Sequence, residues 1–325
     1  MARPEAHLVL VNLGTPATPD AAGVREFLAE FLSDPQVVDL PRFLWFPILH
    51  TMVLRSRPER VARQYRSIWT PEGSPLRVAT ERIVAAVRAQ AGDRIQVIAA
   101  YRYGAPSLEQ VLAGIEQDAR HPVVVVPLFP HRTGATTGTA IDRAREAAAT
   151  TGIGHRLRDR LIPPDDEGYI DALAARWQGA VGADSPEHLV ISFHGIPRRY
   201  ARRERNLYVE DCGRTCAALL ERIGWPAARA TLAYQSRFGP EPWLAPATAD
   251  VLASLPARGV GTVAVMTPGF LTEGLETLEE IAIRGRGTFE AAGGKRFTYI
   301  PAVEDHPSLV RSLIRIATES PDRGP

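Results

Sequence analysis

The 325-residue sequence contains only two cysteines, Cys212 and Cys216, and almost no net charge. Two cysteines give no disulfide framework, which is typical of a reducing compartment. Their spacing of four places both on one face of a helix, where packing is the usual role. A closed zinc or iron–sulfur site needs about four ligands. A net charge of +1 provides no basic field for nucleic acid. These deficits predict a cytoplasmic protein without a nucleic-acid partner.

Long hydrophobic runs are also missing. The N-terminal apolar run is too short for a signal peptide and reads better as a strand. The most apolar later run, FLWFPILHTMVL at residues 43–54, has 12 residues and contains Pro47 and His50, whereas a membrane span needs about 20. The run fits a buried helix. It also fits an apolar lip that contacts a membrane surface or an apolar ligand.

What the sequence does contain is a regular alternation of short β-branched runs and longer amphipathic stretches. This alternation predicts parallel sheets covered by helices on both faces. We expect strands near residues 7–12, 95–101, 122–128, 156–162, 188–193, 229–235, 261–267 and 296–301. We expect helices near residues 20–33, 76–91, 107–118, 138–150, 167–180, 209–223, 245–255, 274–291 and 306–319.

The two halves of the sequence repeat each other. HLVLVNLGTP (7–16) matches HLVISFHGIP (188–197), and two further pairs of segments match in the same order. The repeat predicts an α/β protein of two Rossmann-like domains related by internal duplication, each a four-stranded parallel sheet flanked by helices. We expect domains at 1–165 and 166–325, with the last helix packing back on the first domain.

Ligands of such sheets bind beyond the carboxyl ends of the strands, which predicts a site in the cleft between the two copies. His194 ends a strand of the second copy, where the first copy has Leu13. The imidazole is either a hydrogen-bonded turn residue or a functional proton acceptor and metal ligand.

A second candidate lies in GFLTEGLETLEEIAIRG, residues 269–285. Acidic residues in the first turn of a helix are common because the macrodipole favours them, so Glu279 and Glu280 read as solvated. Glu276 follows a strand and is placed toward the cleft. Paired with His194, it predicts proton transfer or metal handling.

Five motifs, VNLGTP, IWTPEGSPL, SFHGIP, QSRFGPEPW and PGFLTEGLETLEEI, occur in an order that resembles the ferrochelatase family. The resemblance runs from about residue 7 to 320 and is nearest to short bacterial protoporphyrin forms without a C-terminal iron–sulfur extension. It implies a lyase of haem biosynthesis that inserts Fe(II) into protoporphyrin IX with loss of two pyrrole protons. Fe(II) is then a substrate, with no tightly bound cofactor and no iron–sulfur cluster.

The same resemblance assigns residues one at a time. His194 and Glu276 match the catalytic pair and would also contact the metal. The residues that match porphyrin contacts are Leu13, Arg55, Arg57, Tyr65, Ser74, Arg102, Tyr103, Trp243 and Phe270. Residues 41–57 match an apolar lid, which favours the lip interpretation, with peripheral contact of 43–54 at the inner face of the cell membrane. Other haem-pathway enzymes are implied as partners.

Several positions depart from the family pattern. Arg284 stands where many relatives carry an acid, and we expect it to pair with Glu280 four residues earlier. Three alternatives remain at this level: coproporphyrin ferrochelatase, a sirohydrochlorin cobalt or nickel chelatase, and a porphyrin or haem carrier without turnover. Leu13 favours protoporphyrin, because coproporphyrin forms tend to carry Tyr there.

Overall fold

The computed structural model describes residues 5–115, 121–182 and 185–319. The chain forms two compact units. It passes from the first to the second between Ile162 and Pro163, and the segment from Val310 onward belongs again to the first.

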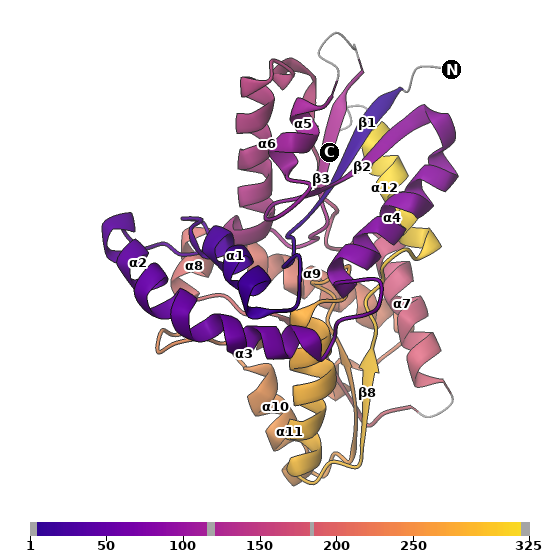
Figure 1. Cartoon of the computed structure of the whole chain (residues 1–325). Helices are drawn as coiled ribbons and strands as arrows, with labels where there is room; N and C mark the ends of the chain where they lie inside the picture. Colours follow the sequence, from indigo (N-terminus) through magenta and orange to yellow (C-terminus); the bar gives the residue numbers. More distant parts are fainter. Residues whose placement is uncertain (1–4, 116–120, 183–184, 320–325) are drawn as a thin grey trace. The chain divides into compact units, whose positions relative to one another are not determined.

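The sheet of the first unit has four parallel strands in the order β2-β1-β3-β4 (Figure 1). Every residue of β1 is buried, as expected of a strand covered by helices on both faces. The strands are β1 (Ala6–Asn12), β2 (Ile95–Tyr101), β3 (Val123–Pro127) and β4 (Leu157–Asp159).

The helices of the first unit include two short π-helical segments, η1 and η3. They are α1 (Ala21–Leu32), α2 (Arg42–Ile48), η1 (Leu49–Val53), α3 (Leu54–Arg66), α4 (Pro75–Ala91), α5 (Leu108–Ala113), η3 (Gly134–Gly138) and α6 (Thr139–Thr150), with 3₁₀ turns η2 (Gly92–Arg94) and η4 (Gly154–Arg156). The helix expected over 107–118 ends at Ala113, and residues 116–118 lie outside the described part of the chain.

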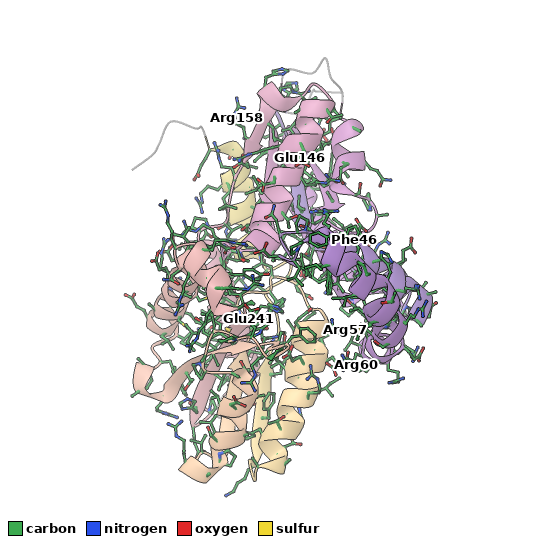
Figure 2. All side chains as sticks on the ribbon, turned by 90° about the vertical axis from the view of Figure 1, so that its left-hand side faces the viewer. Phe46, Arg57, Arg60, Glu146, Arg158 and Glu241 are labelled. Atoms are coloured by element: carbon green, nitrogen blue, oxygen red, sulfur yellow. The ribbon has the colours of Figure 1, made fainter. Side chains whose placement is uncertain are left out.

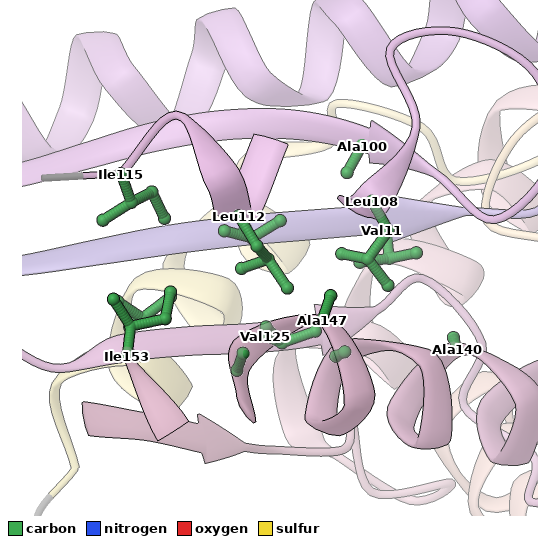
Figure 3. Packing of buried hydrophobic residues seen from close by; sticks show 13 residues of the cluster. Val11, Ala100, Leu108, Leu112, Ile115, Val125, Ala140, Ala147 and Ile153 are labelled. Atoms are coloured by element: carbon green, nitrogen blue, oxygen red, sulfur yellow. The ribbon is translucent and has the colours of Figure 1, made fainter. Parts of the chain in front are cut away.

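One core of the first unit lies between the sheet and α5 and α6 (Figure 3). Val11 and Val125 from the strands meet Leu108 and Leu112 of α5 and an alanine-rich face of α6. The small alanines let α6 approach the sheet closely. Each fully buried Val or Leu contributes about 1.5–3 kcal/mol, so this core fixes where the carboxyl ends of the strands lie.

The second unit repeats this topology. Its parallel strands run in the order β6-β5-β7-β8, the first sheet's order with each strand replaced by its counterpart. The predicted fold class is therefore confirmed. The strands are β5 (His188–His194), β6 (Ala230–Gln235), β7 (Thr262–Met266) and β8 (Arg296–Ile300).

The helices of the second unit contain one clear departure from the sequence pattern. The sequence pattern predicts a single α-helix over 274–291, but residues 275–285 form a π-helix. The helices are α7 (Glu167–Val181), α8 (Arg198–Arg203), α9 (Leu207–Ile223), α10 (Thr248–Ser254), the π-helix η7 (Leu275–Gly285) and α11 (Arg286–Ala291), with 3₁₀ turns η5 (Ala227–Arg229) and η6 (Pro256–Arg258). The last helix, α12 (Pro307–Thr318), spans the return to the first unit.

The apolar 43–54 run is helical and largely exposed. Phe43 is 76% exposed and Met52 65%, while Leu49 and Leu54 are buried against α1. The Trp45 indole donates to Leu32 O at 2.7 Å, which ties the run to the end of α1. A fully buried helix is thus the wrong interpretation of this run. Among residues 5–115, 121–182 and 185–319, no helix combines the length and apolar character of a membrane span.

Candidate active site

His194 is the last residue of β5, and its side chain is half-buried. The Tyr208 hydroxyl donates to its carbonyl oxygen at 2.7 Å. The next residue must be small, because a Cβ on Gly195 would lie 2.6 Å from Gln235 O. The imidazole meets the ring of Phe270, with centroids 6.2 Å apart and planes at 70°. The strand end therefore fixes the imidazole against an aromatic wall.

Glu276 is the second residue of η7. A short relay from the sheet holds its backbone: the Ser192 hydroxyl donates to Gln235 Oε1 at 2.7 Å, and Gln235 Nε2 donates to Glu276 O at 2.6 Å. Ser192 lies on β5 two residues before His194, and Gln235 ends β6. The same two strands thus position both members of the predicted pair. Gln235 was not singled out from the sequence.

The carboxyl of Glu276 has an altered acidity. Burial raises its pKa above the ordinary value, and the negative charges of Glu280 and Glu279 act in the same direction. The charge of His194 opposes this shift. The two side chains therefore interact electrostatically, and a carboxylate with a raised pKa beside an imidazole is a suitable proton acceptor near neutral pH.

The acids that follow Glu276 are already engaged. The Arg284 Nε lies 3.0 and 2.9 Å from the two carboxylate oxygens of Glu279. Glu280 instead accepts from the backbone N–H of Ser236 at 2.7 Å and from its hydroxyl at 2.6 Å. Arg284 reaches Glu280 only at 4.0 Å. The expected Arg284–Glu280 pair is therefore the minor contact, because a π-helix brings residues five apart onto one face.

Glu273 anchors the start of the π-helix and was missed by sequence reasoning. Its buried carboxylate accepts from the hydroxyls of Thr277 and Tyr299 at 2.5 and 2.8 Å and from the N–H of Ala302 at 2.8 Å. Its partners come from η7, β8 and the segment after β8, so only the folded unit reveals the role.

Trp243 is half-buried and forms an antiparallel bridge with Pro197 in the turn after His194. Its Cε3 would lie 3.2 Å from a Cβ at position 195. Trp243 and Phe270 therefore both border the turn that carries His194. Cysteine takes no part here: Cys212 and Cys216 are buried on α9, and burial raises the pKa of Cys216 to about 12.

In the first unit, Leu13 follows β1 and is half-buried. Its N–H donates to the Asn12 side chain at 2.8 Å. Gly14 has φ +107°, and a Cβ there would lie 1.8 Å from Tyr103 O. Leu13 is therefore held in a turn whose backbone conformation at position 14 favours glycine.

Arg102 and Tyr103 are held inside the first unit by Asp34. The Arg102 guanidinium and the hydroxyls of Tyr103 and Thr139 all donate to Asp34 Oδ2. Burial alone would raise the pKa of Asp34, but the hydrogen bonds from Thr139, the Gln36 backbone and Tyr103 outweigh it and hold the pKa below its ordinary value. Tyr103 is 1% exposed. The network therefore stabilises the end of β2 from inside the first unit.

The remaining predicted contacts differ in exposure. Tyr65 is buried beside the Trp69 ring, and Ser74 is buried with its hydroxyl 2.7 Å from the Thr15 hydroxyl. Arg55 is exposed, whereas Arg57 is half-buried. Burial, with a further contribution from Arg60, lowers the Arg57 pKa. Figure 2 shows Arg57 and Arg60 close together on α3.

The structure thus brings His194, Glu276 and Phe270 together in the second unit, and Ser74 and Tyr103 along one pocket in the first. Among the described residues, no cluster of three or more His, Cys, Asp or Glu side chains could hold a metal.

The family model described as Ferrochelatase matches residues 6–320. A protein named Ferrochelatase from Bordetella pertussis is 41% identical over 319 residues, covering 94% of this chain and 85% of the relative. Proteins of the same name from Aeromonas hydrophila (40% identical; 95% and 96% covered) and Sodalis glossinidius (41% identical; 98% and 95% covered) also match.

Among solved structures, the sirohydrochlorin chelatase SirB from Bacillus subtilis subspecies spizizenii with cobalt superposes with a TM-score of 0.56 at 12% identity, covering 96% of this chain and 94% of that chain. CbiX, described as the terminal enzyme of sirohaem biosynthesis in denitrifying bacteria, has a TM-score of 0.50 at 17% identity, covering 97% and 100%. At this identity the likeness shows the fold alone.

Proposed function

The chain belongs to the ferrochelatase family, and from that premise we propose that His194 and Glu276 accept the two pyrrole protons as Fe(II) enters protoporphyrin IX. The enzyme is a lyase of haem biosynthesis whose substrates are Fe(II) and a porphyrin. The observation that carries the proposal is the placement of both residues by neighbouring strands: His194 ends β5, and Gln235 at the end of β6 donates to Glu276 O at 2.6 Å. Burial of the Glu276 carboxyl, which raises its pKa, supports the same role.

The proton balance requires two acceptors. A free porphyrin carries two N–H groups, and the metalloporphyrin carries none. In the proposed step the His194 imidazole takes one proton from a pyrrole nitrogen, and the Glu276 carboxylate takes or relays the other. The four nitrogen lone pairs then bind Fe(II). General-base catalysis of this kind contributes about 10²–10⁴-fold.

A planar macrocycle hides its lone pairs in the ring plane, so a non-planar bound porphyrin would react faster. We propose that Phe270 and Trp243, which border the His194 turn, contact the macrocycle together with Leu13 and Tyr65. The polar groups of Arg102 and Tyr103 already donate to Asp34. We therefore propose that these two residues act indirectly, by stabilising the end of β2.

We assign the propionate contacts to Arg55 and Arg57 on α3. Both are cations of the lid segment, and Arg55 is exposed. A propionate at Ser74 would compete with the Thr15 hydrogen bond in a pocket that four glutamates also line. Ser74 is therefore left out of the propionate proposal.

We propose that the protein works without an iron–sulfur cluster. Such clusters are held by about four cysteine thiolates. The sequence has two cysteines, and burial raises the pKa of both, so both remain thiols at neutral pH.

The exposed apolar face of the lid supports a proposal of peripheral membrane contact. Phe43, Leu44, Ile48 and Met52 are 41–76% exposed, and arginines are frequent along the following helix α3. An apolar face beside cations suits the surface of an anionic bilayer. Flotation with phosphatidylglycerol vesicles tests this. We expect F43S/M52S to reduce binding severalfold and F238S, at a phenylalanine outside the lid that is 61% exposed, to leave it unchanged.

The central test follows Fe(II) insertion by absorbance, with protoporphyrin and coproporphyrin assayed side by side. We expect multiple turnovers and a preference for protoporphyrin. His194→Ala and Glu276→Gln should each lose at least about 100-fold in kcat while still binding porphyrin, and Glu290→Gln on α11 serves as the matched control. Full activity in His194→Ala would refute the proposed role. A stoichiometric spectral change without turnover would instead indicate a carrier.

A further inference from the structure

The chain just after His194 is joined to the segment that carries Trp243. Two main-chain hydrogen bonds connect residues 196–198 with residues 242–244, at 2.9 and 3.0 Å. They flank an antiparallel bridge between Pro197 and Trp243. Helix α8 therefore starts beside the aromatic residue that borders the His194 turn.

The side chain of Arg198, the first residue of α8, is directed to the same segment. Its Nε donates to Trp243 O at 3.2 Å, which places the guanidinium beside the main chain of Trp243. Arg198 is exposed. Within residues 5–115, 121–182 and 185–319, its two terminal nitrogens have no hydrogen-bond or ion-pair partner. The guanidinium is thus held by one nitrogen, and its two NH₂ groups remain available.

Two neighbouring arginines of α8 are already engaged. Arg199 forms an ion pair with Glu241. Both Arg199 and Arg203 stack on the Tyr200 ring, with their guanidinium carbons 4.4 and 4.9 Å from its centroid. These contacts hold the two side chains on the protein surface, so neither is as free as Arg198 to bind a ligand.

Arg202 adds a second available charge. It lies four residues after Arg198, so the two side chains share one face of α8. Arg202 is exposed, and in the described part of the chain its side chain has no anionic partner. Like charges at this spacing destabilise a helix. An anion bound at this face would offset the repulsion, because both guanidinium groups attract it.

The chemistry of the face suits a carboxylate. A guanidinium with two free NH₂ groups can donate two parallel hydrogen bonds to the two oxygens of a carboxylate. The porphyrin is the substrate that brings carboxylates to Trp243. Protoporphyrin has two propionates, which the proposed function assigns to Arg55 and Arg57. Coproporphyrin has four, so two of its carboxylates have no assigned cation.

We propose that Arg198 binds a third porphyrin carboxylate, one that coproporphyrin carries and protoporphyrin lacks, with Arg202 contributing charge. The inference rests on the proposed function, because it assumes that the macrocycle contacts Trp243. Arg198 is then a specificity-determining residue, which adds affinity for coproporphyrin and none for protoporphyrin.

Porphyrin binding without iron tests this separately from the reaction. Fluorescence titrations give Kd for protoporphyrin IX and coproporphyrin III. We expect Arg198→Gln to raise the coproporphyrin Kd about tenfold and to leave the protoporphyrin Kd within about twofold. Arg198→Lys keeps the charge but not the planar fork, so its coproporphyrin Kd should lie between the two. Fe(II) insertion into protoporphyrin by the unaltered protein reports the proposed function independently.

Arg258→Gln is the matched control. Arg258 is an exposed arginine of the same unit that precedes β7, at the edge of the sheet opposite to His194. Its replacement should leave both Kd values unchanged, and urea unfolding verifies that each variant is folded. The proposal is overturned if coproporphyrin does not bind the unaltered protein or if Arg198→Gln leaves its affinity unchanged. Equal weakening of both porphyrins, or the same effect from Arg258→Gln, would also overturn it.

Discussion

Arg284 pairs with Glu279, five residues earlier, and not principally with Glu280, four residues earlier. The pair follows from the π-helical winding of η7. It neutralises one acid next to Glu276, and Ser236 binds the other. Within the described part of the chain, Glu276 is therefore the one acid of the three whose carboxylate accepts no hydrogen bond from another side chain, which suits the proposed exchange of protons.

Breaking this pair should cost stability. Glu279 is 9% exposed at its side chain, so Arg284→Ala would leave a nearly buried carboxylate without its cation. We expect a double-mutant cycle of Arg284→Ala and Glu279→Gln to give a coupling of about 1–2 kcal/mol in urea unfolding. The same cycle at Arg315 and Glu319, where both side chains are about half exposed, should give about 0–0.5 kcal/mol. Equal couplings would contradict the structural distinction.

The raised pKa of Glu276 predicts a pH-dependent stability. Because the folded protein holds this proton more tightly than the unfolded chain, its contribution is fully present below the ordinary pKa of 4.5. It is lost as pH rises through the raised value. Glu276→Gln cannot lose a proton, so it should become more stable relative to the unaltered protein across that window. Urea midpoints measured at several pH values provide the comparison. A difference that stays constant with pH would be inconsistent with the shift.

The duplicated strand ends predict unequal effects of two substitutions. Leu13→Ala removes apolar contact, and we expect a change in porphyrin KM of about two- to tenfold with kcat retained. His194→Ala removes the proposed base, and kcat should fall about 10²–10⁴-fold. Steady-state assays on the same protein preparations separate KM from kcat. Similar effects of the two substitutions would mean that the difference between Leu13 and His194 at the two strand ends has no role in catalysis.

Gly14 should be irreplaceable in the turn that presents Leu13. Its φ of +107° is strained for other residues, and an added Cβ would lie 1.8 Å from Tyr103 O. We expect Gly14→Ala to lower the free energy of unfolding by about 3 kcal/mol or more. Gly152→Ala is the matched control, because Gly152 has φ +78° with no atom near its would-be Cβ. Its cost should be only about 1 kcal/mol.

The sheet architecture could be predicted because it depends on local patterns. Buried parallel strands such as β1 and β5 are continuous apolar runs, and the repeat aligned them with their partners. The π-helix could not be predicted, since the residues of η7 have the apolar stripe of an ordinary α-helix.

Within the site, His194 and Glu276 were recognisable as chemistry-bearing residues at strand ends. Their supports were not. Gln235 reaches Glu276 across 41 residues, and Asp34 reaches Tyr103 across 69. Such contacts depend on which chain segments the fold places together. The exposure of the 43–54 run was also open, because its apolar residues suited either a core or a surface until the helices were placed.

The return of the chain to the first unit at Val310 affects how the protein is made. Leu313, Ile316 and Ala317 of α12 are buried residues of a unit that otherwise ends at Ile162. During synthesis on the ribosome, the second unit is therefore complete before the first has received its last helix. The N-terminal half must remain unfinished while nearly 150 further residues are translated (residues 163–309), which makes it the part of the nascent chain most in need of protection from aggregation.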